Sequence, residues 1–226
     1  MATDNQRQRA DVELLPLEDA DLTAVAAGNI LAFPGFYEAL ETDSSATDHA
    51  TRVQRQATRL RKVLASPLVL GTKTVLSSGR EKGTLVGIAL SHRPGAPVVN
   101  LKSRLARLGE EETEEEKKAW DGVDTEKWNG QWGGWDRTRE RIMGDVPHWY
   151  IAPLWILPEY QGQGIGGKLM QQILDLADAQ TPTTPVYLEA TAEGKAMYEK
   201  RGFVVEGGGE YVEMVRWNKD GRGRPE

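Results

Sequence analysis

The chain has 226 residues and a net charge of −6, and 39% of its residues are hydrophobic. This length suits one large domain with a real core. The acidic balance argues against a surface that binds nucleic acid or an anionic membrane. Because cysteine is absent, disulfides, thiolate catalysis and cysteine-based metal sites are excluded. His49, His92 and His148 are far apart in the sequence, so we predict no metal site.

The ends of the chain predict where the protein works. Residues 1–11 lack the apolar core of a signal peptide, and no apolar run reaches the ~20 residues needed to span a bilayer. We therefore expect a cytoplasmic protein, a monomer or homodimer, with neither nucleic acid nor membrane as partner. We expect one domain over residues 11–217, with loose tails at 1–10 and 218–226.

The first half of the chain alternates strand and helix signals. Residues 12–17 predict a strand, and the helix that follows stops at Pro34, where a short second helix begins. A longer helix is predicted over 46–65, because its apolar residues recur on one stripe. Residues 72–92 then predict a β-hairpin around the turn GREKG.

A long interruption, residues 94–147, separates the two halves and is called the insertion below. Its run EEETEEEKK predicts a solvated, partly helical segment. Trp128, Trp132 and Trp135 recur at helical spacing, although the three neighbouring glycines weaken any helix there. These tryptophans need a surface to cover, so they predict either core packing or the wall of a pocket.

The second half reads as strand, helix, strand, helix and two closing strands. Residues 148–157 predict a buried strand, and the helix after the glycines has an apolar face that ends near Ala177. Residues 185–190 predict the next strand, followed by a short helix that ends at Gly202. The order of elements predicts a mixed α/β or α+β domain.

Three phosphate-binding patterns overlap on QGQGIGGKL, residues 161–169. The nucleotide triphosphatase pattern fails because Leu169 stands where a hydroxyl must hold Mg²⁺. The dinucleotide pattern remains a distant alternative, since four residues separate the strand from the first glycine and few residues remain for further parallel strands. The third pattern, QxxGxG, fits a helix start whose free N–H groups bind a pyrophosphate, with Gln161 bracing the turn.

Two blocks resemble the GNAT superfamily of N-acetyltransferases. LWILPEYQGQGIGGKLM resembles the acetyl-CoA motif of that family, and YLEATAEGKAMYEKRGF resembles its last strand, helix and strand, with Tyr198 four residues before Gly202. Together they cover residues 148–205 and look most like the small-molecule, puromycin acetyltransferase-like branch. The resemblance implies an α/β (α+β) fold, with a mostly antiparallel sheet, two splayed parallel strands and helices on both faces.

The resemblance also implies a set of acetyl-CoA contacts. The cofactor's arm would bind the free backbone of strand 148–157, and its phosphates would bind the glycine turn. The expected cofactor-binding residues are Leu154, Trp155, Ile156, Gln161, Gly162, Gln163, Gly164, Ile165, Gly166, Gly167, Lys168, Thr191, Lys195 and Tyr198. Thr191 stands where many members have Asn, and the insertion is long for the family.

The sequence identifies the catalytic groups less specifically than the cofactor contacts. Position by position, the resemblance makes Tyr198 the proton donor to the leaving sulfur. The base stays open between Glu189, His148 and a water chain. Strand alternation predicts that His148, Tyr150, Ala152 and Leu154 share one face, so that His148 and Tyr150 reach the acceptor.

The acceptor is expected to be a small, partly apolar or aromatic amine. Its predicted contacts are Phe36, Tyr37, Trp128, Trp132, Trp135 and Tyr150. Two alternatives remain open: a protein or peptide N-acetyltransferase, which needs an open groove, and a GNAT-fold protein that binds CoA without turnover.

Overall fold

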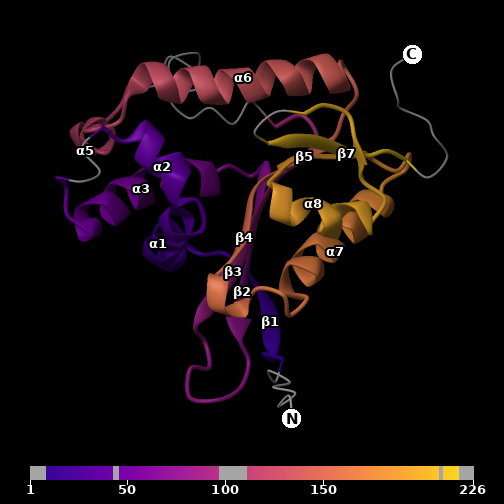
Figure 1. Ribbon diagram of the computed structural model, residues 1–226, viewed down its shortest axis with the longest axis horizontal. Helices are drawn as coiled ribbons and strands as arrows, with labels where there is room; N and C mark the ends of the chain where they lie inside the picture. The colour runs from indigo at the N-terminus through magenta and orange to yellow at the C-terminus, as the bar shows by residue number, and fades with distance from the viewer. Residues whose placement is uncertain (1–8, 43–45, 97–110, 209–210, 219–226) are drawn as a thin grey trace, which may run out of the picture.

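The described residues of the computed structural model form a seven-stranded mixed sheet with helices on both faces (Figure 1). These residues are 9–42, 46–96, 111–208 and 211–218. The strand order is β1-β2-β3-β4-β5-β7-β6, and only β4 and β5 pair in parallel. This arrangement confirms the predicted mixed, mostly antiparallel sheet. The single parallel pair does not fit the doubly wound sheet of the dinucleotide alternative.

The predicted elements are present, and their bounds are as follows. The strands are β1 (Val12–Pro16), β2 (Val69–Leu76), β3 (Leu85–His92), β4 (Trp149–Ile156), β5 (Val186–Ala190), β6 (Val204–Val205) and β7 (Val212–Arg216). The helices are α1 (Leu22–Ala32), α2 (Pro34–Leu40), α3 (His49–Leu64), α5 (Glu114–Lys118), α6 (Thr125–Met143), α7 (Ile165–Asp178) and α8 (Ala192–Glu199).

Apolar helix faces determine which side of the sheet each helix covers. The stripe of α3 buries Val53, Ala57 and Leu60 together with α1 and with Trp155 of β4. The stripe of α7 packs on the opposite side, and Ile173 and Leu174 contact the buried residues of β5. In Figure 1 the two helix groups therefore stand on either side of the sheet.

The two parallel strands separate after a short contact. β4 and β5 pair only from Trp149 to Ile151, opposite Val186 to Leu188. Beyond Ile151, β4 continues along β3 up to Ile156, with no strand paired on its other side in the described part of the chain. The predicted splay of these strands is thus present, and it opens a gap in the middle of the sheet.

The insertion contributes α5 and α6, while residues 97–110 lie outside the described residues. Helix α6 runs unbroken across the glycines that were expected to weaken it. Asp124 caps its first turn by accepting a hydrogen bond from the Lys127 N–H, and Met143 at its end is fully buried against β5 and β7. Capping and packing therefore outweigh the helix-breaking tendency of glycine here.

A buried arginine fastens the insertion to the rest of the molecule. Arg59 of α3 donates hydrogen bonds to the Glu41 carboxylate (2.8 Å) and to the carbonyl oxygen of Ala119 (3.2 Å). Its guanidinium also lies over the rings of Trp120 and Trp128, at 5.4 and 5.6 Å from their centroids. No helix among the described residues is long and apolar enough to cross a membrane.

Candidate active site

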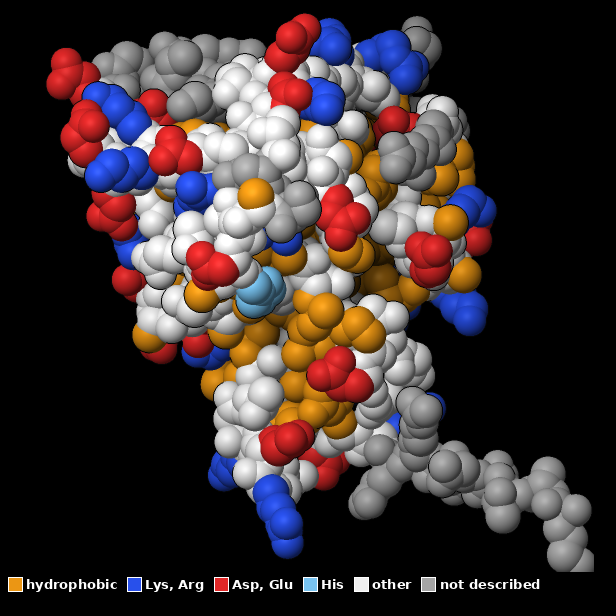
Figure 2. Space-filling view, turned by 60° about the vertical axis from the view of Figure 1, so that its left-hand side comes forward, with side chains coloured by type: hydrophobic (Ala, Val, Ile, Leu, Met, Phe, Trp, Pro, Cys, Tyr) orange, Lys and Arg blue, Asp and Glu red, His pale blue; other side chains and the backbone are white. Residues whose placement is uncertain are grey.

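One cavity of about 930 Å³ occupies the gap between β4 and β5. Residues of α1, α2, α6, α7 and α8 line it, together with both separated strands and Tyr211 before β7. Figure 2 shows apolar side chains gathered in a hollow on one face of the molecule. The volume lies near the upper end of the ~300–1,000 Å³ typical of small-molecule sites.

The glycine cradle, residues 161–167, comprises the turn before α7 and the start of that helix, and most of its residues line the cavity. Gly162 and Gly164 have φ values of 75° and 83°, a left-handed conformation that other residues rarely adopt. The space beside both Cα atoms is open, so a bound group can approach the backbone closely. The Gln161 amide donates a hydrogen bond to the carbonyl oxygen of Ile156 (2.9 Å), which confirms that it braces the turn.

The first turn of α7 therefore suits an anion. The free N–H groups and the positive dipole end of this helix lie at the cavity wall. Gly164 and Gly166 place no side chain between them and the cavity. This geometry fits the pyrophosphate of a nucleotide cofactor. Gln163 does not line the cavity. Its carboxamide oxygen accepts a hydrogen bond from the Ala10 N–H (2.7 Å).

The cations beside the cradle differ from those singled out in the sequence. Lys168 is exposed and Lys195 pairs with Glu199, and neither residue lines the cavity. Lys200 and Arg201, at the end of α8, do line it. A Cβ on Gly167 would lie 2.1 Å from the Arg201 guanidinium, so that residue is packed directly on the first turn of α7. The sequence KRGF contains both cations. Basic residues at a helix end are also common at solvated positions, so the sequence alone does not single them out.

The edge of β4 that faces the cavity is irregular. Its pairing with β3 shifts register between Ala89 and Ser91, which places a bulge in β4 near Pro153. As a result Leu154 packs on the α7 side, 3.8 Å from where a Gly166 Cβ would lie, whereas Tyr150 and Ala152 pack with α6. The prediction that Leu154 shares a face with Tyr150 was therefore wrong. Leu154, Trp155 and Ile156 all line the cavity.

Tyr198 lines the cavity from α8 and is only 7% exposed. Burial raises the pKa of its hydroxyl to about 12, against the opposing charge of Arg201, so the hydroxyl holds its proton at neutral pH. Thr191, at the start of α8, also lines the cavity, and its side chain accepts a hydrogen bond from the Gly194 N–H.

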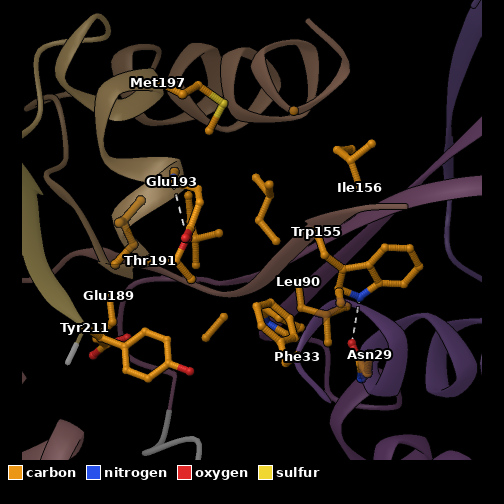
Figure 3. A pocket seen from close by; sticks show the side chains of 18 of the residues that line it. Asn29, Phe33, Leu90, Trp155, Ile156, Glu189, Thr191, Glu193, Met197 and Tyr211 are labelled. Carbon is orange, nitrogen blue, oxygen red and sulfur yellow. Dashed lines mark hydrogen bonds between the residues drawn. The ribbon is translucent and has the colours of Figure 1, made fainter. Parts of the chain in front are cut away.

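Glu189 projects from β5 into the same cavity, beside Tyr211 (Figure 3). The Tyr150 hydroxyl donates a hydrogen bond of 2.8 Å to its Oε2. Burial raises the pKa of the Glu189 carboxyl to about 7, an effect that hydrogen bonding to Tyr150 and Tyr187 and the charge of Arg139 oppose. A carboxyl with this pKa can accept and release a proton near neutral pH.

Charged groups from two further elements surround Glu189. Arg139 of α6 is buried, with its guanidinium 4.3 Å from the centre of the Tyr150 ring and 3.5 Å from the Asp136 carboxylate. Glu213 of β7 pairs with Glu189 across the strands, and its charge raises the pKa of Glu189. Neither Arg139 nor Glu213 was found by sequence reasoning, because both depend on how α6 and β7 dock on β5.

His148, the other candidate base, is not among the residues that line the cavity. Its Nδ1 lies within hydrogen-bond distance of the Val146 carbonyl oxygen (2.7 Å), and its ring contacts Tyr187. Burial lowers the pKa of this histidine below its ordinary value. Of the two side chains, only Glu189 lies where an acceptor can reach it.

Aromatic side chains from several segments meet at the end of the cavity that holds Glu189. This aromatic wall consists of Phe36, Trp128, Trp132, Trp135 and Tyr211. Trp128 is 3% exposed and packs on Trp120 and Leu40, whereas Trp132 and Trp135 are half-buried. Tyr37 also lines the cavity, and its hydroxyl accepts a hydrogen bond from Gln56 (2.7 Å). The tryptophans thus provide both core packing and pocket wall.

The sequence matches the model of the Acetyltransferase (GNAT) family over residues 70–203, more than half of the chain. No curated protein matches the chain significantly. Among solved structures, an acetyltransferase from Corynebacterium glutamicum described as histone acetyltransferase HPA2 and related is similar. It shares 20% identity at a TM-score of 0.58, with 92% of this chain and 96% of that chain covered.

Two further structures are similar to the chain. The PaiA N-acetyltransferase of Thermoplasma acidophilum, in complex with coenzyme A, shares 13% identity at a TM-score of 0.50, with 91% and 98% of the two chains covered. The aminoglycoside acetyltransferase AAC(6')-Ib, also with coenzyme A, shares 19% identity at a TM-score of 0.50, with 93% and 96% covered. At these identities the likeness shows the common fold.

Proposed function

Because the chain belongs to the acetyltransferase (GNAT) family, we propose that it transfers the acetyl group of acetyl-CoA directly to the amino group of a small molecule. Family membership makes the protein an acetyltransferase that uses acetyl-CoA. The proposal adds the acceptor and the residues that act on it. One observation carries it: the glycine cradle, Tyr198, Glu189 and the aromatic wall all line one cavity.

The cofactor half of the site rests on backbone groups. The free N–H groups at the start of α7 are positioned for the pyrophosphate, with Arg201 beside them. The unpaired edge of β4, from Leu154 to Ile156, offers its main chain to the cofactor's arm. When bound there, acetyl-CoA supplies the thioester carbonyl and a thiolate leaving group.

Two side chains are assigned the proton transfers. Glu189 accepts one proton from the acceptor's ammonium group, and the freed nitrogen lone pair forms the new N–C bond as the C–S bond breaks. The nitrogen then loses its second proton, which restores the Tyr198 hydroxyl after that group has protonated the sulfur. Tyr198 donates its proton to the departing sulfur, a role supported by its place in the lining of the cavity and by its hydroxyl being protonated at neutral pH. Tyr150 orients Glu189 through their hydrogen bond. The absence of cysteine supports direct transfer without a thiol carrier.

A small acceptor is favoured over a peptide by the walls of the cavity. Helix α6 and Tyr211 stand over the end that holds Glu189, and Arg59 fastens α5 and α6 to α3 through buried contacts. A peptide substrate needs an extended open groove at this place.

An acceptor screen that monitors CoA release and identifies the product by mass tests the proposal. Its arms are small amines and peptides with free N-termini or lysines. Acetylated small amines are the expected products. Acetylated peptides, with small amines unused, would support the protein N-acetyltransferase alternative instead. CoA binding without any acetyl transfer would support the non-catalytic alternative.

A further inference from the structure

The acceptor end of the cavity presents ring faces and ring edges in a defined arrangement. Phe36 and Trp135 stack, with centroids 5.7 Å apart and planes 14° apart. Trp132 meets Trp135 edge-on, with ring centroids 5.1 Å apart. Tyr211, from the segment before β7, also meets Trp135 edge-on, with centroids 5.2 Å apart. Stacked and edge-to-face contacts are the favourable geometries of aromatic pairs. A further flat ring from a ligand can join this set in the same two ways.

Among the described residues, the same end of the cavity holds one acidic group and no basic residue in its lining. Glu189 lies beside Tyr211 in Figure 3, whereas the lining cations Lys200 and Arg201 directly follow α8, and Arg201 packs on the glycine cradle. Glu193, the other carboxylate of the lining, is exposed on the first turn of α8. Of the described residues, Glu189 is therefore the carboxylate available to an ammonium group among the rings.

The number of charges that this end can accept follows from desolvation. A second ammonium on the ligand would lose its hydration and gain only contacts with ring faces. The attraction of a ring face is weaker than the hydration that an ion loses when it leaves water. A carboxylate next to the reacting amine would face Glu189, a like charge in a site that already raises the pKa of that carboxyl by desolvation. Polyamines and amino acids are therefore both disfavoured.

We propose that the acceptor is a primary monoamine with a flat, uncharged aromatic body, an arylalkylamine. Its amino group lies at Glu189, and its ring lies against Trp132, Trp135 and Tyr211. This inference rests on the proposed function, since it names the substrate class of the same site.

The test compares four amines at saturating acetyl-CoA: phenethylamine, hexylamine, cadaverine and L-phenylalanine. Hexylamine keeps the single charge and lacks the ring, the diamine cadaverine adds a charge, and phenylalanine adds a carboxylate to the phenethylamine skeleton. We expect the kcat/KM for phenethylamine to exceed that for hexylamine by roughly tenfold. We expect it to exceed the values for cadaverine and for phenylalanine by roughly a hundredfold or more.

A matched pair of variants locates the preference in the wall. Trp135→Leu keeps apolar bulk and removes the flat face, so the ratio of kcat/KM for phenethylamine over hexylamine is expected to fall toward one. A ratio cancels any loss common to both amines. Trp217→Leu is the control, because Trp217 is half-buried outside the cavity lining, with its indole N–H bonded to Glu206. The control is expected to keep the wild-type ratio.

The outcomes separate the inference from the proposed function. Equal or better use of hexylamine, cadaverine or phenylalanine would overturn the arylalkylamine assignment while leaving a small-molecule acetyltransferase. An unchanged ratio in Trp135→Leu would overturn the role of the wall. A panel with no acetylated amine, alongside an acetylated peptide, would remove the proposed function and the inference with it.

Discussion

The two ends of the cavity are built from different parts of the chain and by different means. The cofactor end comes from two continuous stretches, β4 to α7 and β5 to α8, and offers mainly backbone groups. The acceptor end gathers side chains from α2, α6, β5 and the segment before β7. In the proposed function, backbone groups bind the acetyl-CoA that the family uses, whereas side chains from distant segments bind the acceptor.

This difference predicts that changes at the two ends are separable. Variants at the acceptor end are expected to alter turnover or acceptor use while CoA affinity is kept. Variants at the glycine cradle are expected to reduce CoA affinity. Substitutions at Glu189, Tyr198, Gly164 and Arg139 test that division, and the largest effect is expected at Glu189.

The Glu189→Gln variant is expected to lower kcat/KM for the amine by ~10²–10⁴-fold, the range for a lost general base. CoA affinity, measured by calorimetry, is expected to stay near wild type. Glu213→Gln is the matched control, since Glu213 is the cross-strand partner of Glu189 and lies outside the cavity lining. Equal losses in both variants would show a general electrostatic effect and contradict a direct role for Glu189.

The same variant gives an independent reading of the Glu189 proton. Folding raises the pKa of this carboxyl from 4.5 to about 7, so the folded state favours the protonated form. Stability from this group is therefore full below pH 4.5 and is lost as the pH rises through 7. Glu189→Gln, which cannot ionise, is expected to melt above the wild type at about pH 8, and the difference should disappear toward pH 4.5.

Tyr198→Phe is expected to lower kcat by roughly 10²-fold, because the leaving sulfur loses its proton donor. The phenyl ring keeps the contact with Phe203, so CoA affinity should be little changed. The measurement is single-turnover acetyl transfer, which isolates the chemical step. A wild-type rate in that experiment would leave Tyr198 with a packing role.

At the cofactor end, Gly164→Val is expected to weaken CoA binding by roughly tenfold or more, since a side chain there blocks close approach to the backbone. Gly79→Val is the control. Gly79 has nearly the same φ, 82° against 83°, and lies in the hairpin turn outside the cavity lining. Both variants carry a similar backbone strain of ~1–3 kcal/mol. If both bind CoA equally well, the cradle is not the phosphate site.

The smallest effect concerns the charges around Glu189. Arg139 lowers and Glu213 raises the pKa of this carboxyl. Arg139→Gln is therefore expected to move the acid limb of the kcat/KM profile to higher pH, and Glu213→Gln to lower pH, each by less than about one unit. Arg139→Lys, which keeps the charge, is expected to shift it least. Shifts in the same direction for Arg139→Gln and Glu213→Gln would contradict the assignment of the limb to Glu189.

The contrast between the two ends also explains what the sequence could predict. The order of elements and the glycine turn were accessible, because they depend on local patterns such as the apolar stripe of α7. The splayed strands were expected only from the resemblance to the GNAT family. The face of the sheet on which Leu154 packs could not be predicted, since a bulge near Pro153 interrupts the alternation of side chains along β4. Arg139 could not be placed either, because its guanidinium meets the Tyr150 ring only after α6 docks on the sheet.

Within the acceptor end, the tryptophans show the same limit. Their helical spacing was visible, but the glycines between them argued against a helix that packing and the Asp124 cap nevertheless stabilise. Tyr211 completes the wall from a segment that lies far along the chain from Trp135, and no local pattern points to it.

The most direct test of whether the two ends form one active site is initial-rate kinetics in which the concentrations of acetyl-CoA and phenethylamine are both varied. Direct transfer requires both molecules in the cavity together, so double-reciprocal plots are expected to intersect, with equimolar CoA and N-acetylated amine as products. Parallel lines, together with an acetylated form of the protein in intact-mass spectra, would contradict direct transfer between the two ends.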